Sequence, residues 1–208
     1  MKINKPKISV YEEKNILDAL NESEFNNYIF NKNIDEHVEI KDATFDSCTF
    51  NNIDFTNIEL NSVNLMDVIF NECNLSNKCF DEKMIGRVEF NNCKMLGTSF
   101  INASLKDVMF NNCNTRYLNF SNALLNNILI KDSDLKEATF MEIDIKNIEF
   151  DNVKLNGVDF IKVNLNKVDF SNCDISSTNF DTKSLKGIII DRFQSQDLIG
   201  MLGVNIKE

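Results

Sequence analysis

Six cysteines are the residues of this 208-residue chain best suited to bind a metal or form disulfides. Zinc sites favour short paired spacings such as Cys-x2-Cys, whereas three of these cysteines recur 20 residues apart. Five of the six share one place in a five-residue pattern, a place held elsewhere mostly by small apolar residues: Cys48, Cys73, Cys93, Cys113 and Cys173. Because a free cysteine behaves as a small hydrophobe, we expect core thiols, one exposed thiol at Cys79, no metal and no cofactor.

Other catalytic groups are few. The single histidine, His37, lies in an acidic stretch with no serine or cysteine partner suggested nearby, so we assign it no catalytic role. Paired carboxylates could hydrolyse a glycosidic bond, and acidic residues are abundant. Phosphate-binding, dinucleotide and nucleophile-elbow motifs are absent from the sequence. We expect a protein that is not an enzyme, with a β-helix hydrolase as the weakest of three hypotheses.

A five-residue period organises the chain that carries these groups. Counted in fives from 45 to 190, 29 of 30 positions hold Phe, Leu, Ile or Met, and Thr115 is the exception. Two residues before each of them, 27 of 30 positions hold Ala, Cys, Ser, Thr, Val, Ile or Leu, the exceptions being Lys78, Lys83 and Lys183. Neither a helix nor a flat strand has this period. It is typical of a chain that turns a corner every five residues.

A second period of 20 residues shows that four such sides make one coil. Phe occupies 12 of the 15 multiples of ten from 50 to 190, and Phe-Asn-x-Cys recurs at 70–73, 90–93 and 110–113. Self-similarity at a fixed spacing is the mark of a solenoid. We predict an all-β solenoid, a quadrilateral β-helix of 20-residue coils, about eight coils and about 40 Å long at the usual strand spacing.

The register divides the chain into three parts. We expect an N-terminal cap or irregular segment at 1–24, the repeat at 25–190, and a C-terminal helix and tail at 191–208. Within the first part, residues 11–20 form either a short helix or an irregular rung, and Asp35 marks a bulge in the repeat. The apolar face of the last part either caps the final coil or, with residues 188–190, pairs with its copy in a dimer.

Charge narrows the class of partner. The 32 acidic and 22 basic residues give a net charge of −10, which argues against binding nucleic acid through phosphate contacts and favours a basic partner. No apolar run is long enough for a membrane span, and the N-terminus lacks the apolar stretch of a secretory signal, so we expect a cytoplasmic protein without membrane contact.

The acid is concentrated in one half of the chain. Residues 12–82 contain 16 acidic and 4 basic residues, whereas 83–208 contain 16 and 15. Spread over three and a half coils, the first segment has one net charge per ~1.4 Å, close to ~1.7 Å for duplex DNA. The alternative is that outward charges serve solubility alone. The candidate partner-binding residues are the acidic side chains Asp42, Asp46, Asp54, Glu59, Asp67 and Glu72.

The repeating steps, such as Ala123-Leu124-Leu125 and Asp174-Ile175, resemble the pentapeptide-repeat family, whose usual motif is A(D/N)LXX. Within it, two stretches are similar to the Qnr quinolone-resistance proteins in order and spacing. One runs from Cys73 to Ser104 through Gly86, Glu89, Cys93, Gly97, Phe100 and Ala103. The other runs from Leu185-Lys186-Gly187 through Gln194, Leu198 and Leu202 to Gly203.

This resemblance implies a right-handed quadrilateral β-helix and a dimeric acidic rod that imitates B-form DNA. Such a rod binds type II topoisomerases, DNA gyrase and topoisomerase IV, where DNA would lie, and relieves quinolone poisoning. In that family the C-terminal helix forms the homodimer. By position, the resemblance therefore assigns the dimer interface to Phe193, Leu198, Met201 and Leu202.

One departure from that family bears on function. Many Qnr proteins have loops that interrupt the repeat and contact the enzyme, but here no five-residue count is lost between 40 and 190. The sequence therefore supports a second hypothesis, in which the chain is a pentapeptide-repeat scaffold for another protein partner and does not modulate topoisomerase activity.

Overall fold

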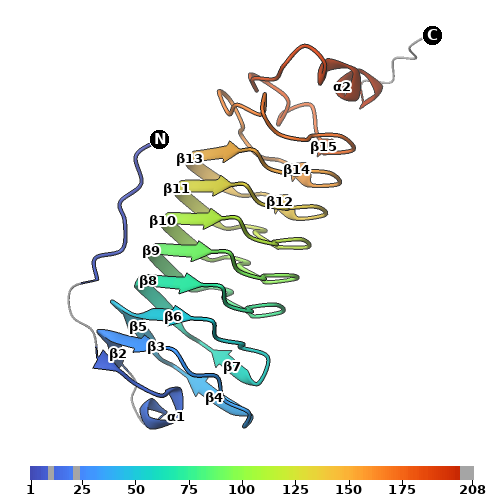
Figure 1. Cartoon of the computed structure of the whole chain (residues 1–208). Helices are drawn as coiled ribbons and strands as arrows, with labels where there is room; N and C mark the ends of the chain where they lie inside the picture. The colour runs from blue at the N-terminus through green and yellow to red at the C-terminus, as the bar shows by residue number, and fades with distance from the viewer. Residues whose placement is uncertain (9–11, 21–23, 202–208) are drawn as a thin grey trace.

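The computed structural model describes residues 1–8, 12–20 and 24–201. The chain winds into a rod in which each coil stacks on the one before (Figure 1). All strand pairs are parallel, and partners in the central strands lie 20 residues apart, as in Phe70 with Phe90 and Phe90 with Phe110. This confirms the predicted all-β solenoid, a quadrilateral β-helix of 20-residue coils with about eight turns.

Three parallel sheets and two short helices make up the described structure. The ten-stranded sheet contains β1 (Glu12–Glu13), β2 (Glu24–Asn26), β3 (Tyr28–Phe30), β5 (Thr44–Asp46), β6 (Thr49–Asn51), β8 (Asn64–Asn71), β9 (Met84–Asn91), β10 (Ser104–Asn111), β11 (Leu124–Lys131) and β13 (Asp144–Asp151). The smaller sheets are β4 (Val38–Lys41) with β7 (Ile58–Asn61), and β12 (Thr139–Met141) with β14 (Asp159–Ile161) and β15 (Asn179–Phe180). The helices are α1 (Ile16–Ala19) and α2 (Ser195–Met201).

The corners explain the polar residues of the repeat. At most corners one residue, two places after the large inward side chain, has a positive φ, for example 55° at Asp67 and 55° at Glu72. Asn, Asp and Gly tolerate this left-handed conformation better than bulky residues do. Tyr117, with φ of 60°, occupies the same place despite its ring. The turn therefore favours Asn, Asp, Ser and Gly at the corner without excluding larger residues, and it sets the five-residue step.

Phenylalanine columns fill the interior. Phe70, Phe90 and Phe110 stack with ring centroids 5.1 and 5.0 Å apart and planes within 12°. Phe100, from the column on the opposite side, meets Phe110 edge-on with centroids 6.2 Å apart. Each buried Phe contributes roughly 1.5–3 kcal/mol through the hydrophobic effect. The alternation of Phe with smaller apolar residues on adjacent sides leaves room for both columns.

The Phe-Asn-x-Cys motif makes ladders that run along the rod. The side-chain amide of Asn71 donates to Asn51 Oδ1 at 2.8 Å, and that of Asn91 donates to Asn71 Oδ1 at 3.1 Å. The thiol of Cys93 points inward and donates to the carbonyl of Phe70 at 3.5 Å. The five predicted core cysteines are buried and Cys79 is exposed, as expected from the pattern.

Three breaks in the pattern are accommodated locally. Ile34 is buried in place of the exposed Asp35, and Ser184 is buried in place of the exposed Lys183. Thr115 remains in the core with 1% exposure, and its hydroxyl donates to the carbonyl of Asp134 at 2.9 Å. A polar residue fits the core here because its hydrogen bond is satisfied within the next coil.

The N-terminal segment divides into two structures. Helix α1 packs Ile16 into the core at the first coil, and the side chain of Asn15 caps it by accepting from the Leu17 amide. Residues 1–8, by contrast, do not cover the end of the rod. They run back along its side, beside β8 to β13 (Figure 1). We call residues 1–8 the arm.

Candidate functional site

The six candidate acidic residues are distributed around the rod and do not form one site. The 20-residue register places them on four different sides. Asp42, Asp54, Glu59 and Glu72 are exposed and Asp46 is half-buried. Asp67, in contrast, is buried. The predicted acidic residues therefore surround the N-terminal half of the rod, and one of them, Asp67, is withdrawn from solvent.

One side of the rod brings two of the predicted residues together. Strands β4 and β7 pair Glu39 with Glu59, and Asp42 directly follows β4. One coil further, Asp81 and Glu82 extend the same side. We call these five carboxylates, Glu39, Asp42, Glu59, Asp81 and Glu82, the acidic face.

The acidic face ends abruptly. Its segments at 38–42, 58–62 and 78–82 contain five acidic and two basic residues, whereas the next two coils, at 98–102 and 118–122, contain none of either sign. His37 lies at its edge, with Nε2 3.2 Å from a carboxylate oxygen of Glu59. Grouping the acidic residues by the 20-residue period would have found Glu39, Asp81 and Glu82, which sequence reasoning left out.

Asp54 is held by its own turn. Its carboxylate accepts from the Thr56 amide at 2.9 Å, the Thr56 hydroxyl at 2.5 Å and the Asn74 side chain at 3.1 Å. The hydrogen bonds from Thr56 lower the pKa of Asp54, so the group stays ionised. Its charge faces solvent, and all three of these hydrogen bonds are accepted by one oxygen, Oδ1.

Asp67 forms a largely buried ion pair with Arg87 of the next coil. Its carboxylate accepts from Nε of Arg87 at 2.6 Å and from the backbone amide of Lys7, in the arm, at 2.8 Å. Burial alone would raise the pKa of Asp67, but the hydrogen bonds from Arg87 and Lys7 outweigh it and lower that pKa. Asp67 therefore anchors the arm, and its carboxylate is not available to a partner in this structure.

The predicted dimer residues lie at the opposite end. Phe193 precedes α2 and its side chain is 68% exposed, with the Arg192 guanidinium 4.5 Å from its ring centroid. Leu198 is half-buried against the core. Met201 is the last residue of α2, and Leu202 lies outside the described residues. Of these four, Phe193 is the side chain that the structure shows to be open to a partner.

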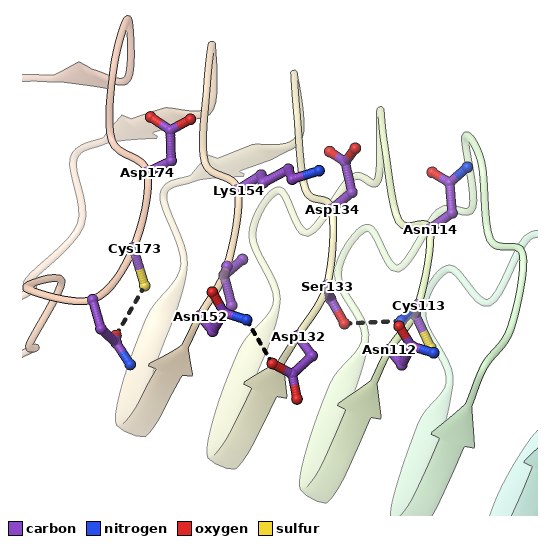
Figure 2. A pocket seen from close by; sticks show the side chains of 12 residues that line it. Asn112, Cys113, Asn114, Asp132, Ser133, Asp134, Asn152, Lys154, Cys173 and Asp174 are labelled. Atoms are coloured by element: carbon purple, nitrogen blue, oxygen red, sulfur yellow. Dashed lines mark hydrogen bonds between the residues drawn. The ribbon is translucent and has the colours of Figure 1, made fainter.

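A groove of about 700 Å³ runs along one corner of the C-terminal half (Figure 2). Four successive coils line it with residues 112–114, 132–134, 152–154 and 172–174. Figure 2 shows two hydrogen bonds between coils in this groove: Asn152 donates to Asp132 at 2.7 Å, and the Cys113 amide donates to the Ser133 hydroxyl at 3.0 Å.

Asp174, in this groove, lacks the raised pKa of a general acid. Burial would raise the pKa of Asp174, but hydrogen bonds from Asn156 and Ser176 lower it, whereas a general acid needs a raised pKa. Asp134 accepts from the amide of Lys136 in its own turn. The geometry therefore gives the hydrolase hypothesis no support. Among the residues that the structure describes, no cluster of three or more His, Cys, Asp or Glu could hold a metal ion.

Two family models match the solenoid. A model of the pentapeptide repeat region matches residues 63–140, and a model of pentapeptide repeats in eight copies matches 39–77 and 143–181. Together they cover most of the solenoid. The chain belongs to the pentapeptide-repeat family. The match agrees with the five-residue register, the Phe columns and the left-handed corners described above.

Solved pentapeptide-repeat structures are similar to this chain at low identity. HetL of the cyanobacterium Nostoc, a protein involved in heterocyst differentiation regulation, has a TM-score of 0.53 at 15% identity over 84% of this chain and 90% of HetL. Full-length QnrB1, a plasmid-mediated fluoroquinolone resistance protein, has a TM-score of 0.46 at 20% identity over 94% and 97%. A thylakoid-lumen protein of Arabidopsis thaliana has 0.36 at 22% over 62% and 83%.

These similarities extend to the fold and no further. No sequence of a curated protein matches this pentapeptide-repeat chain significantly. In the part of the chain that the structure describes, neither helix is long and apolar enough to span a bilayer.

Proposed function

We propose that this pentapeptide-repeat protein binds the type II topoisomerases DNA gyrase and topoisomerase IV as an acidic mimic of duplex DNA, and protects them from quinolones. The protein acts by binding, without catalysis and without a cofactor. The acidic face, with its abrupt end after Glu82, is the observation that carries the proposal.

The spacing of charge supports a nucleic-acid-like ligand surface. Duplex DNA has one negative charge per ~1.7 Å of its axis, and a protein that grips it does so with clustered Lys and Arg. Residues 12–82 have a net charge of −12, from 16 acidic and 4 basic residues, on a rod whose coils rise by ~4.8 Å. A basic DNA-binding channel would meet a similar charge density along this half of the rod.

The sequence similarity to Qnr proteins between Cys73 and Ser104 is the second support. Much of that stretch consists of core positions, such as Cys93 and Phe100, which the fold alone explains. Glu89 is half-buried on β9 and is not required by the core, so its match is more informative. The resemblance therefore adds weight to the charge argument but does not replace it.

The test is a gyrase supercoiling assay with ciprofloxacin. We expect the purified protein to restore supercoiling, and the triple variant Glu39→Gln, Asp42→Asn, Glu59→Gln to need at least tenfold more protein. Asn tolerates the left-handed φ of 50° at position 42, so the fold should persist. The matched control neutralises three C-terminal carboxylates, Glu137→Gln, Glu142→Gln and Asp159→Asn. No protection at any concentration would defeat the proposal, as would equal loss in the two triple variants.

The proposed assembly is a homodimer through the C-terminus, with Phe193 at its centre. An exposed aromatic side chain beside an amphipathic helix is a typical interface anchor. Sedimentation of Phe193→Glu should show a monomer where the parent chain sediments as a dimer. If both sediment as monomers, the helix is a cap and the proposed assembly is wrong.

A second candidate is a scaffold for a different protein partner. It is favoured by the uninterrupted register, because no loop of the kind that contacts the enzyme in many Qnr proteins projects between residues 38 and 180. Under this alternative the acidic face still binds a basic protein. Capture from cell extract on the parent chain and on the triple acidic-face variant would distinguish them: recovery of a protein other than a topoisomerase subunit, lost with the variant, favours the scaffold.

A further inference from the structure

From Lys7 to Asn4 the arm lies along one corner of the solenoid, and Met1 contacts the adjacent side. The amide of Lys7 donates to Asp67 at 2.8 Å, and the carbonyl of Lys7 accepts from the Ser47 hydroxyl at 3.3 Å. Two coils further, Asn4 donates to Asp107 through its amide at 3.3 Å and its side chain at 3.1 Å. The amino group of Met1 lies 2.6 Å from a carboxylate oxygen of Glu149.

The spacing of these contacts shows that the arm is extended and parallel to the axis of the rod. Asp67 and Asp107 are two coils apart, about 10 Å at ~4.8 Å per coil. Lys7 and Asn4 are three residues apart, also about 10 Å for an extended chain at ~3.3 Å per residue. A straight peptide therefore meets an equivalent corner side chain about every one and a half residues, without bending.

The corner offers two carboxylate acceptors and one hydroxyl donor to a peptide backbone. Ser47, Asp67 and Asp107 have left-handed φ values of 55°, 55° and 57°, the conformation required at each turn. Asp67 is fixed by Arg87, and Asp107 also accepts from Asn127 at 3.0 Å. With the arm in place the two carboxylates are 5% and 2% exposed, so the arm and the neighbouring corners shield them from solvent. We call Ser47, Asp67 and Asp107 the arm seat.

The arm itself has the composition of a ligand for this seat. Residues 1–8 include three lysines and no acidic residue. Ile3, Pro6 and Ile8 are half-buried, whereas the three lysines face solvent. Two of the contacts on the seat use the main chain of Lys7 and do not depend on its side chain. Such contacts would accept another extended segment, and the positive charge of Lys7, which helps to lower the pKa of Asp67, favours a lysine-rich one.

We propose that the arm seat is a binding groove for an extended lysine-rich segment of a partner protein, and that residues 1–8 are its built-in occupant. The partner segment displaces the arm and donates its own amides to Asp67 and Asp107. Because the arm is tethered, it competes at a high effective concentration. A partner segment must therefore bind the seat more strongly than the arm does, or must also contact another part of the rod. This inference does not depend on the partner being a topoisomerase.

A labelled peptide with the sequence of residues 1–8 is the probe, titrated into the full-length chain and followed by fluorescence anisotropy. In the parent chain the tethered arm should block binding of the labelled peptide. The variant Asn4→Ala, Lys7→Pro removes the side-chain donor to Asp107 and the amide donor to Asp67, and leaves the seat intact. We expect the peptide to bind this variant at least tenfold more tightly than the parent, with affinity falling as salt rises.

Two further variants, made on the arm-weakened chain, test the seat. Asp107→Asn keeps a residue suited to left-handed φ but removes the carboxylate, and should weaken peptide binding at least fivefold. Asp132→Asn changes a corner aspartate with φ of 48° elsewhere on the rod and should leave binding unchanged. Failure of the peptide to bind the arm-weakened chain, or equal affinity of the Asp107→Asn and Asp132→Asn variants, would overturn the inference.

Trypsin provides a measurement of the arm in the parent chain. The bond after Lys7 should be cleaved slowly in the parent and at least tenfold faster in an Asn4→Ala variant, which keeps the cleavage site. Equal rates, matching that of the free peptide, would show that the arm does not occupy the seat in solution.

Discussion

The guanidinium of Arg87 grips the carboxylate of Asp67 from one coil away, with Nε 2.6 Å from Oδ1 and a terminal nitrogen 2.5 Å from Oδ2. The same terminal nitrogen donates to the sulfur of Met66 at 3.2 Å. This pair connects strands β8 and β9 at their shared corner and fixes the acceptor that the arm uses. The arm and the solenoid therefore depend on one side chain.

Arg87→Ala should lower the free energy of unfolding by about 2 kcal/mol, because it leaves Asp67 largely buried without its cation. The cost stays below that of a fully buried pair since the Arg87 side chain is 30% exposed. Urea unfolding measures the loss. The double variant Asp67→Asn, Arg87→Ala should recover part of it, and Lys131→Ala, which breaks an exposed pair, is the control. Equal losses for Arg87→Ala and Lys131→Ala would contradict the prediction.

Acid should weaken the contacts between the arm and the arm seat and so destabilise the fold. Despite burial, hydrogen bonds lower the pKa of Asp67, chiefly from Arg87, and that of Asp107, chiefly from Asn4. A carboxyl whose pKa is lower in the folded protein stabilises it above the ordinary value near 3.9, and this contribution is lost as pH falls through the folded pKa. The temperature of the thermal unfolding midpoint should therefore fall as the pH is lowered below about 4, and it should fall less steeply in the Asp107→Asn variant. An identical pH profile for that variant would refute the assignment.

Tyr117→Asn should stabilise the protein by about 0.5–1 kcal/mol, since Asn adopts the left-handed φ of 60° more readily than Tyr. The ring is 46% exposed, so little packing is lost. Thermal unfolding of Tyr117→Asn and of the control Tyr117→Phe measures the difference. A lower midpoint for Tyr117→Asn would mean that the contact of the ring with Arg116 outweighs backbone strain.

Alkylation should distinguish the thiols. Burial raises the pKa of Cys48 to about 11 and that of Cys173 to about 11, and both are shielded from reagent. Iodoacetamide at about pH 8 should therefore modify one of the six cysteines in the native protein, Cys79, and all six in urea. Mass spectrometry of the intact protein counts them. Native modification of Cys48 would show that the coils open readily.

The fold was predictable because the core, the hydrogen-bonded ladders and the corners all repeat with the same period in the sequence. Phe90 stacks on Phe70 and Asn91 bonds to Asn71, both across 20 residues, and the contact of the Cys93 thiol with the Phe70 carbonyl recurs 20 residues later between Cys113 and Phe90. Breaks such as Asp35 were visible as lost register. Local pattern and global winding agree, which is the condition for reading a solenoid from its sequence.

The candidate site was harder to predict, for physical reasons. Outward carboxylates obey no packing rule, so the sequence could not separate Glu59, on the acidic face, from Asp67, which Arg87 and the arm withdraw from solvent. The path of the arm was also invisible to periodicity, because residues 1–8 have no repeat. Three lysines without an acidic residue, just before an acid-rich segment, were the available signal.

A solenoid melts easily from its ends because each coil is attached only to its neighbours. The arm changes that by touching coils that never meet one another, from Ser47 through Asp107 to Glu149. The arm links coils along the length of the rod, so unfolding of one coil disturbs contacts several coils away. Releasing the arm should turn a single sharp melting transition into a gradual, end-first one, and any partner that takes its seat would loosen the rod as it binds.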